Sequence, residues 1–155
     1  MTVVAVAKWT EAPLKKFVED ARVHVVLLLN TSGQVLAQSG FARSMDVMSA
    51  CALASAIHAT ASELGRRMEG KPFSGSHFAG RERQFFLAPA NNRQGTQLVC
   101  AVFDSQTSFG LVRIYFDELT RSLADAAPAP DDRTVTADDF ERELNRNLAV
   151  LFGRA

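Results

Sequence analysis

Residues 23–36 read Val-His-Val-Val-Leu-Leu-Leu-Asn-Thr-Ser-Gly-Gln-Val-Leu, and they give the clearest structural signal in the chain. The run Val23–Asn30 is rich in valine and leucine and is too short for a typical helix, so it predicts a buried strand. Ser32-Gly33 is a turn signal, and the alternating residues 35–40 predict a second strand after it. The two strands and their turn form a predicted β-hairpin.

The segments on either side of this hairpin complete the predicted fold. A helix is expected over Thr10–Ala21, because Leu14, Phe17 and Ala21 lie three or four residues apart. The elements expected after the hairpin are a helix at Asp46–Glu69, strands at Phe73–Ala79, Gln84–Ala90 and Leu98–Phe103, and a helix capped by Thr107 or Ser108 that ends near Ala124. This α-β-β-α-β-β-β-α order predicts the α+β class, with a five-stranded antiparallel sheet and helices packed on it.

Two details of the last strands bear on the predicted topology. Pro89 has no backbone N–H, so it predicts an edge position or a bulge near the end of its strand. Residues 91–96 are expected to form a loop that is longer than a tight hairpin turn.

The long helix Asp46–Glu69 has two unequal faces. We expect Ser44 to cap it, with Asp46 in its first turn, where the helix dipole favours an anion. One face is predicted to pack on the core, and its residues are Val47, Ala50, Ala54, Ile57, Ala61, Leu64 and Met68. The opposite face consists of Met48, Ala52, Ser55, Ala59, Glu63 and Arg66. Half of these are small, where a solvated face would carry Lys and Glu throughout, so this face is predicted to bind another protein.

The chain is expected to continue beyond the folded domain as a tether and a helix. The predicted domain covers residues 10–124, a linker rich in Ala, Pro and Asp covers 125–135, and a helix covers 136–153. The apolar side of this C-terminal helix consists of Phe140, Leu144, Leu148 and Leu151 or Phe152. Such a side needs a groove on its own domain or on a partner, so Phe140, Leu144 and Leu148 are predicted to bind a partner.

Composition and charge disfavour several classes of protein. The chain has 155 residues with 17 basic and 17 acidic side chains, and this balance disfavours a general nucleic-acid or anionic-membrane binder. The longest uninterrupted apolar run, Leu98–Phe103, is far too short to span a bilayer, and the first residues lack the basic start of a signal peptide, so we expect a cytoplasmic protein. The balance is uneven, because residues 1–116 carry 12 basic and 8 acidic side chains, and residues 117–155 carry 5 and 9.

No segment has the pattern of a catalytic, metal or cofactor site. Residues 65–72 match G-x-x-x-x-G-K, but Pro72 stands where a phosphate-binding loop needs Ser or Thr. The three histidines lack metal-ligand spacing, Cys51 and Cys100 are expected to be reduced core thiols, and no nucleophile motif occurs. An enzyme with its own active site is therefore disfavoured. Basic residues do gather in one stretch, either as a solvated helix end with loops or as a patch for an acidic partner; they are Arg66, Arg67, Lys71, Arg81, Arg83 and Arg93.

Several strings resemble the Roadblock/dynein light chain family, and most nearly its bacterial MglB type. They are Val26–Asn30 followed by Gly33–Leu36, Asp46 at the start of the small-residue helix, and Phe103-Asp104-x-x-Thr107-Ser108-x-Gly110-Leu111-Val112-Arg113. The last string is the most specific, and the resemblance covers roughly residues 10–124. It implies a profilin-like Roadblock domain that forms a homodimer, with two sheets joined edge to edge and the long helices together on one face.

The resemblance also implies a partner and an activity. The partner is a small Ras-like GTPase of the MglA type, in bacterial cell polarity and gliding motility, with the cell poles as the expected location. The regulator clasps the GTPase as a dimer, donates no catalytic arginine, and promotes GTP hydrolysis, while its C-terminal segment adjusts nucleotide exchange. The alternatives are a scaffold that leaves hydrolysis unchanged and a small-ligand sensor, although the apolar strands offer little polar lining for a ligand pocket.

Overall fold

The computed structural model describes residues 3–41, 45–130 and 145, and it contains a single five-stranded sheet over these residues. Its helices are α1 (Val3–Ala21), α2 (Val47–Glu69) and α3 (Phe109–Ala126). Its strands are β1 (Val25–Asn30), β2 (Val35–Gly40), β3 (Ser76–Ala79), β4 (Gln84–Asn92) and β5 (Gly95–Phe103). The strand order is β2-β1-β5-β4-β3 and all pairs are antiparallel, which confirms the predicted α+β class and element order.

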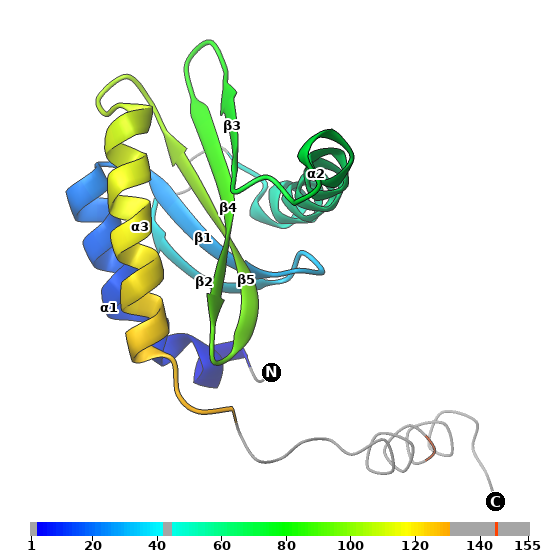
Figure 1. Ribbon diagram of the computed structural model, residues 1–155. Helices are drawn as coiled ribbons and strands as arrows, with labels where there is room; N and C mark the ends of the chain where they lie inside the picture. Colours follow the sequence, from blue (N-terminus) through cyan, green and yellow to red (C-terminus); the bar gives the residue numbers. More distant parts are fainter. Residues whose placement is uncertain (1–2, 42–44, 131–144, 146–155) are drawn as a thin grey trace, which may run out of the picture.

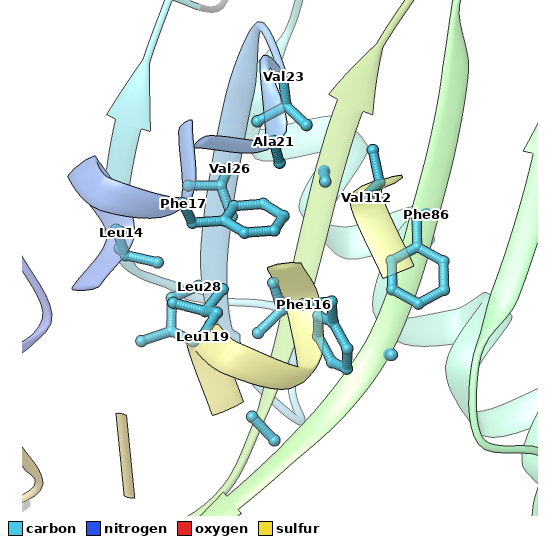
Figure 2. Packing of buried hydrophobic residues seen from close by; sticks show 14 of the residues in the cluster. Leu14, Phe17, Ala21, Val23, Val26, Leu28, Phe86, Val112, Phe116 and Leu119 are labelled. Atoms are coloured by element: carbon cyan, nitrogen blue, oxygen red, sulfur yellow. The ribbon is translucent and has the colours of Figure 1, made fainter. Parts of the chain in front are cut away.

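The two faces of the sheet are covered differently (Figure 1). Helices α1 and α3 lie side by side on one face, and α2 alone lies on the other. Figure 2 shows the first face, where Phe17 of α1 and Phe116 and Leu119 of α3 pack near Val26 and Leu28 of β1. The second face packs Leu27, Leu87 and Cys100 against Cys51 and Ala54 of α2. Because β1 and β5 are in the middle of the sheet, side chains on both of their faces are buried, as their composition predicts.

Helix α1 begins earlier than predicted. It starts at Val3 rather than at Thr10, and it continues through Pro13. Thr10 is only 1% exposed and lies inside the helix, so it does not mark the helix start. The prediction used the spacing of the apolar residues from Leu14 onward. This spacing shows which part of α1 packs on the sheet, and it does not show where the helix begins.

The caps of α2 and α3 explain where these helices begin and end. Asp46, rather than Ser44, is the N-cap of α2, since its carboxylate accepts hydrogen bonds from the N–H and hydroxyl of Ser49 at 3.2 and 2.8 Å. These bonds hold the pKa of Asp46 below its ordinary value. Ser44 lies outside the described residues. As predicted, Ser108 caps α3 by accepting from the N–H of Leu111. Gly70 ends α2 in the left-handed region.

The β4–β5 connection is a tight hairpin, so the prediction of a longer loop was wrong. Asn91 pairs with Thr96 and Asn92 with Gly95, which leaves two residues in the turn. Asparagine is rare in strands, but here the two amides bond across the ladder. The Thr96 hydroxyl donates to Asn91 at 2.6 Å, and the Asn92 amide donates to Gln97 at 2.6 Å.

Pro89 occupies a local edge, as predicted. The pairing of β3 with β4 runs from Ala79↔Gln84 to Ser76↔Leu87, so it stops before Pro89. The missing N–H of Pro89 therefore costs no hydrogen bond to β3.

Candidate functional site

Helix α2 sits on the sheet through its smallest side chains. Its buried residues are Cys51, Ala54, Ser62 and Gly65. A Cβ on Gly65 would stand 2.6 Å from the Phe73 nitrogen and 2.8 Å from the Lys71 oxygen, so the glycine lets the loop after α2 lie against the helix. Small residues bring α2 close to the sheet, and several of its larger apolar residues, among them Leu53, Leu64 and Met68, are left exposed.

The core-facing prediction for α2 is therefore partly wrong. Ala54 is buried, and Val47 and Ile57 pack partly buried against the same core cluster, but Leu64 and Met68, which were expected in the core, are 51% and 69% exposed. Leu53 is 64% exposed on the same side of the helix. We name Leu53, Ile57, Leu64 and Met68 the apolar stripe. The prediction assumed that the largest apolar residues point inward, whereas the contact with the sheet is centred on small residues about a quarter turn away.

The predicted partner-binding face is mostly on the surface. Five of its six residues are exposed, namely Met48, Ala52, Ala59, Glu63 and Arg66. We name these five residues the small-residue face. Ser55 differs, because it is partly buried and its hydroxyl donates to the Thr31 carbonyl at 2.6 Å. Ser55 thus fastens α2 to the β1–β2 turn, where a Cβ on Gly33 would lie 3.2 Å from the Ala52 backbone.

The predicted basic patch is divided between separate parts of the molecule. Arg66, Arg67 and Lys71 lie at the C-terminal end of α2, where Glu63 accepts from Arg67 at 3.1 Å and from Arg66 at 3.5 Å. Arg81 and Arg83 flank the β3–β4 turn, whereas Arg93 lies in the β4–β5 turn at the opposite end of β4. The nine residues of β4 span about 27 Å. The six side chains therefore do not form one patch, and those at the end of α2 adjoin the apolar stripe.

Strand β3 forms one edge of the sheet beside this surface. Among the described strands it pairs with β4 alone, so its other edge presents backbone groups without a strand partner. Phe78 is 47% exposed and packs its ring 6.4 Å from that of Phe85, on the same sheet face as α2. On the opposite face, His77 stacks on Phe109 at 4.0 Å and bonds to Gln84, which holds β3 against α3.

The predicted C-terminal partner-binding residues Phe140, Leu144 and Leu148 lie outside the described residues. The start of the linker is described, and it is fastened to the domain. The Gln94 amide in the β4–β5 turn donates to the carbonyls of Pro128 and Ala129 at 2.8 and 3.4 Å. Ala127 is 3% exposed. The route of the chain out of the domain is therefore defined as far as residue 129.

The cysteines and His58, whose side chains could act as nucleophiles, bases or metal ligands, are buried or partly buried in the domain. Burial raises the pKa of both Cys51 and Cys100, which keeps these thiols protonated and unreactive. Partial burial, with Arg66 nearby, lowers the pKa of His58. Within residues 3–41, 45–130 and 145, no three His, Cys, Asp or Glu side chains form a group that could hold a metal ion.

His24 and Asp104 form a pair that ties β1 to the loop before α3. The His24 Nε2 and Asp104 Oδ2 atoms are 2.7 Å apart. The Gln106 N–H, and after it His24, lower the pKa of Asp104. Asp104 lies within the Phe103–Arg113 string, and its bond to His24 gives it a structural role there.

We expect Asp104→Asn to flatten the acid limb of the stability curve. Because the folded-state pKa of Asp104 is lowered, its stabilising contribution is complete above the unfolded pKa of about 4 and is lost as the pH falls through the folded value. Urea unfolding between pH 2 and 7 measures this. Asp117→Asn, on exposed α3 surface, is the control, and an unchanged acid limb in Asp104→Asn would contradict the assignment.

By length and composition, α2 could cross a membrane, and it is the one helix of the described residues that passes this test. Its most apolar 18-residue window has a mean hydropathy of 1.2, and only 11% of that window is buried. The helix nevertheless buries four residues, packs Cys51 and Ala54 on the sheet and is capped at both ends. We interpret its apolar character as the mark of a surface that another protein covers.

Solved structures identify the fold. MglB of Myxococcus xanthus matches with a TM-score of 0.69 at 21% identity, over 76% of this chain and 94% of that protein. The gliding protein MglB of Thermus thermophilus matches with a TM-score of 0.69 at 17% identity, over 79% and 91%. A Roadblock/LC7 domain of Streptomyces avermitilis matches with a TM-score of 0.62 at 18% identity, over 73% and 92%.

No protein-family model matches the sequence, and no curated protein matches it. The structural matches establish that this chain has the Roadblock/MglB-like fold, which confirms the resemblance at the level of fold.

Proposed function

We propose that this protein is a dimeric regulator of a small Ras-like GTPase of the MglA type. The observation that carries the proposal is the uncovered surface of α2, which presents the apolar stripe on one side and the small-residue face on the other. The fold shared with MglB proteins supports the choice of partner. The regulator acts by binding, without an active site of its own, in the cytoplasm and at the cell poles.

The apolar stripe fits a second copy of this chain. Leu53, Leu64 and Met68 are each more than half exposed, and Phe78 lies on the same sheet face at the edge strand β3. A two-fold axis near β3 would pair the β3 strands of two copies and bring their apolar stripes together. This arrangement buries apolar surface and gives the backbone groups at the edge of β3 hydrogen-bond partners. This self-complementarity supports the proposed dimer.

The small-residue face fits a protein that approaches closely. Ala52 and Ala59 leave room for another backbone, while Glu63 and Arg66 are exposed at its end for charged contacts. In a dimer that uses the apolar stripe, this second face of α2 remains available to the GTPase.

GTP hydrolysis by an MglA-type GTPase from the same organism tests the proposed function. Adding the regulator is expected to raise the single-turnover rate and to give a complex with the GTPase in its GTP-bound form. Binding without a change in rate would favour the scaffold alternative, including a role in assembling a polarity complex. Neither binding nor stimulation would contradict the proposal. An effect on nucleotide exchange is measured in parallel by release of a fluorescent GDP analogue.

Leu64→Ala should weaken the dimer roughly tenfold, because it truncates a large apolar side chain of the apolar stripe in both copies. Sedimentation equilibrium at several concentrations measures the effect. Ile114→Ala is the matched control, since Ile114 is 65% exposed on α3, away from the stripe. Equal dimer dissociation constants for Leu64→Ala and the unmodified chain would place the dimer contact elsewhere.

A further inference from the structure

The apolar stripe has a second candidate occupant in the same chain. We propose that the C-terminal segment 138–152 docks on the apolar stripe as a helix antiparallel to α2, and that it competes there with a second copy. The docking itself does not depend on the proposed function. Only its consequence, control of dimer formation, rests on that function.

The two apolar patterns match in spacing and length. Phe140, Leu144, Leu148 and Leu151 are separated by four, four and three residues, which places them on one side of a helix about 17 Å long. The apolar stripe of α2 runs from Leu53 to Met68, a rise of about 22 Å. The segment therefore fits within the stripe. The small-residue face offers Ala52 and Ala59 in the corresponding region and is less suited to bury leucine and phenylalanine.

The charges favour an antiparallel orientation. Residues 138–143 carry four acidic side chains and one basic one, whereas residues 144–155 carry two arginines and no acid. On α2 the order is reversed, with Asp46 at the N-cap and a net positive charge at the C-terminal end, where Arg66, Arg67 and Lys71 outnumber Glu63 and Glu69. Glu63 already pairs with Arg66 and Arg67, and this pairing reduces its repulsion of the acidic side chains at the start of the docked segment. Antiparallel docking thus places unlike charges together at both ends, and it also opposes the two helix dipoles.

The linker is long enough for this docking. Gln94 fixes the chain at Pro128 and Ala129 beside the β4–β5 turn. Leu87, which packs on the α2 side of the sheet, lies five residues along β4 from Asn92, a distance of about 17 Å. The eleven residues from Ala129 to Phe140 extend as far as about 36 Å. They can therefore pass around the end of the sheet and reach α2.

Because both occupants use the same side chains, docking of the segment lowers the fraction of chains that are able to dimerise. A tether of this length gives the segment an effective concentration in the millimolar range. If it covers the stripe nine-tenths of the time, the apparent affinity for a second copy falls about tenfold for each protomer.

A pair of engineered cysteines in the full chain tests the docking and its direction. Leu64→Cys with Leu144→Cys is expected to form an intramolecular disulfide under mild oxidation, whereas Leu53→Cys with Leu144→Cys is not. Cys51 and Cys100 are buried and stay in both variants. Intact-mass analysis under non-reducing conditions detects the bond. Equal cross-linking in both pairs, cross-linking of the Leu53 pair alone, only intermolecular bonds or no bond at all would overturn the proposal.

Charge substitutions in the full chain provide an independent readout. Leu148→Asp should lower the apparent dimer dissociation constant by tenfold or more, because it releases the segment from the stripe and leaves α2 intact. Ala149→Asp adds the same charge off the segment's apolar side and should leave dimerisation unchanged. An unchanged constant for Leu148→Asp, or an equal change in both variants, would overturn the competition. Neither measurement contains a GTPase, and the disulfide test needs no dimer, so failure of the docking is distinct from failure of the proposed function.

Discussion

Ala59→Arg should abolish stimulation of the GTPase while leaving this protein folded and dimeric. Ala59 is exposed in the middle of the small-residue face, on the opposite side of α2 from Leu64. An arginine there holds the approaching backbone away and leaves a desolvated charge without a partner at the contact. We expect the affinity for the GTPase to fall at least about 100-fold. Isothermal titration with the GTP-bound GTPase and single-turnover hydrolysis measure the two effects.

The control for this prediction is another exposed alanine. Ala126→Arg adds the same side chain at the end of α3, on the opposite side of the sheet, and should change neither binding nor hydrolysis. Circular dichroism and sedimentation of Ala59→Arg test whether the fold and the dimer persist. Full affinity in a folded, dimeric Ala59→Arg variant would show that the GTPase does not use the small-residue face.

Gly40→Ala should give the largest loss of stability. Gly40 ends β2 with φ near +90°, and a Cβ there would lie 2.3 Å from the carbonyl oxygen of His24. The neighbour is backbone within the β1–β2 ladder, where the Phe41 N–H also bonds to His24, so it cannot easily move. We expect the free energy of unfolding to fall by about 3 kcal/mol or more, through backbone strain and steric overlap together.

Gly95→Ala separates these two causes. Gly95 has φ near +98°, but a Cβ there would meet nothing within 4 Å. Its substitution should therefore cost only the backbone strain, about 1 kcal/mol. Urea unfolding of both variants gives the comparison. Equal losses would show that the overlap with His24 is relieved by a shift of the chain.

The sequence predicted the sheet better than it predicted the surface. Val25–Asn30 and Leu98–Phe103 have side chains that only a doubly covered strand can bury, so their central positions follow from composition. The caps at Ser108 and Gly70 follow from local chemistry. The β4–β5 hairpin was missed because its asparagines are satisfied by bonds across the strands, which involve partners that local patterns do not reveal.

The error on α2 has a different physical origin. Helical periodicity identified its faces, but it could not say which face the sheet would take. Leu64 and Met68 were expected inside because large apolar residues usually are, whereas Cys51, Ala54 and Gly65 are the residues that allow close packing. A helix that buries its small residues and exposes its large ones is typical of an interaction surface. The same ambiguity left Ser55 on the predicted binding face, although its hydroxyl bonds to Thr31.

The unequal covering of the sheet also links binding to the opening motions of the domain. Two helices close the α1–α3 face with a larger buried cluster, while α2 buries only four residues on the other face, so local unfolding costs less free energy at α2 than at α1 or α3. Any occupant of the apolar stripe binds the seated helix and not the detached one. By mass action it strengthens the contact between α2 and the sheet, and the concentration of the occupant thereby sets how often the second face of the sheet is exposed to water.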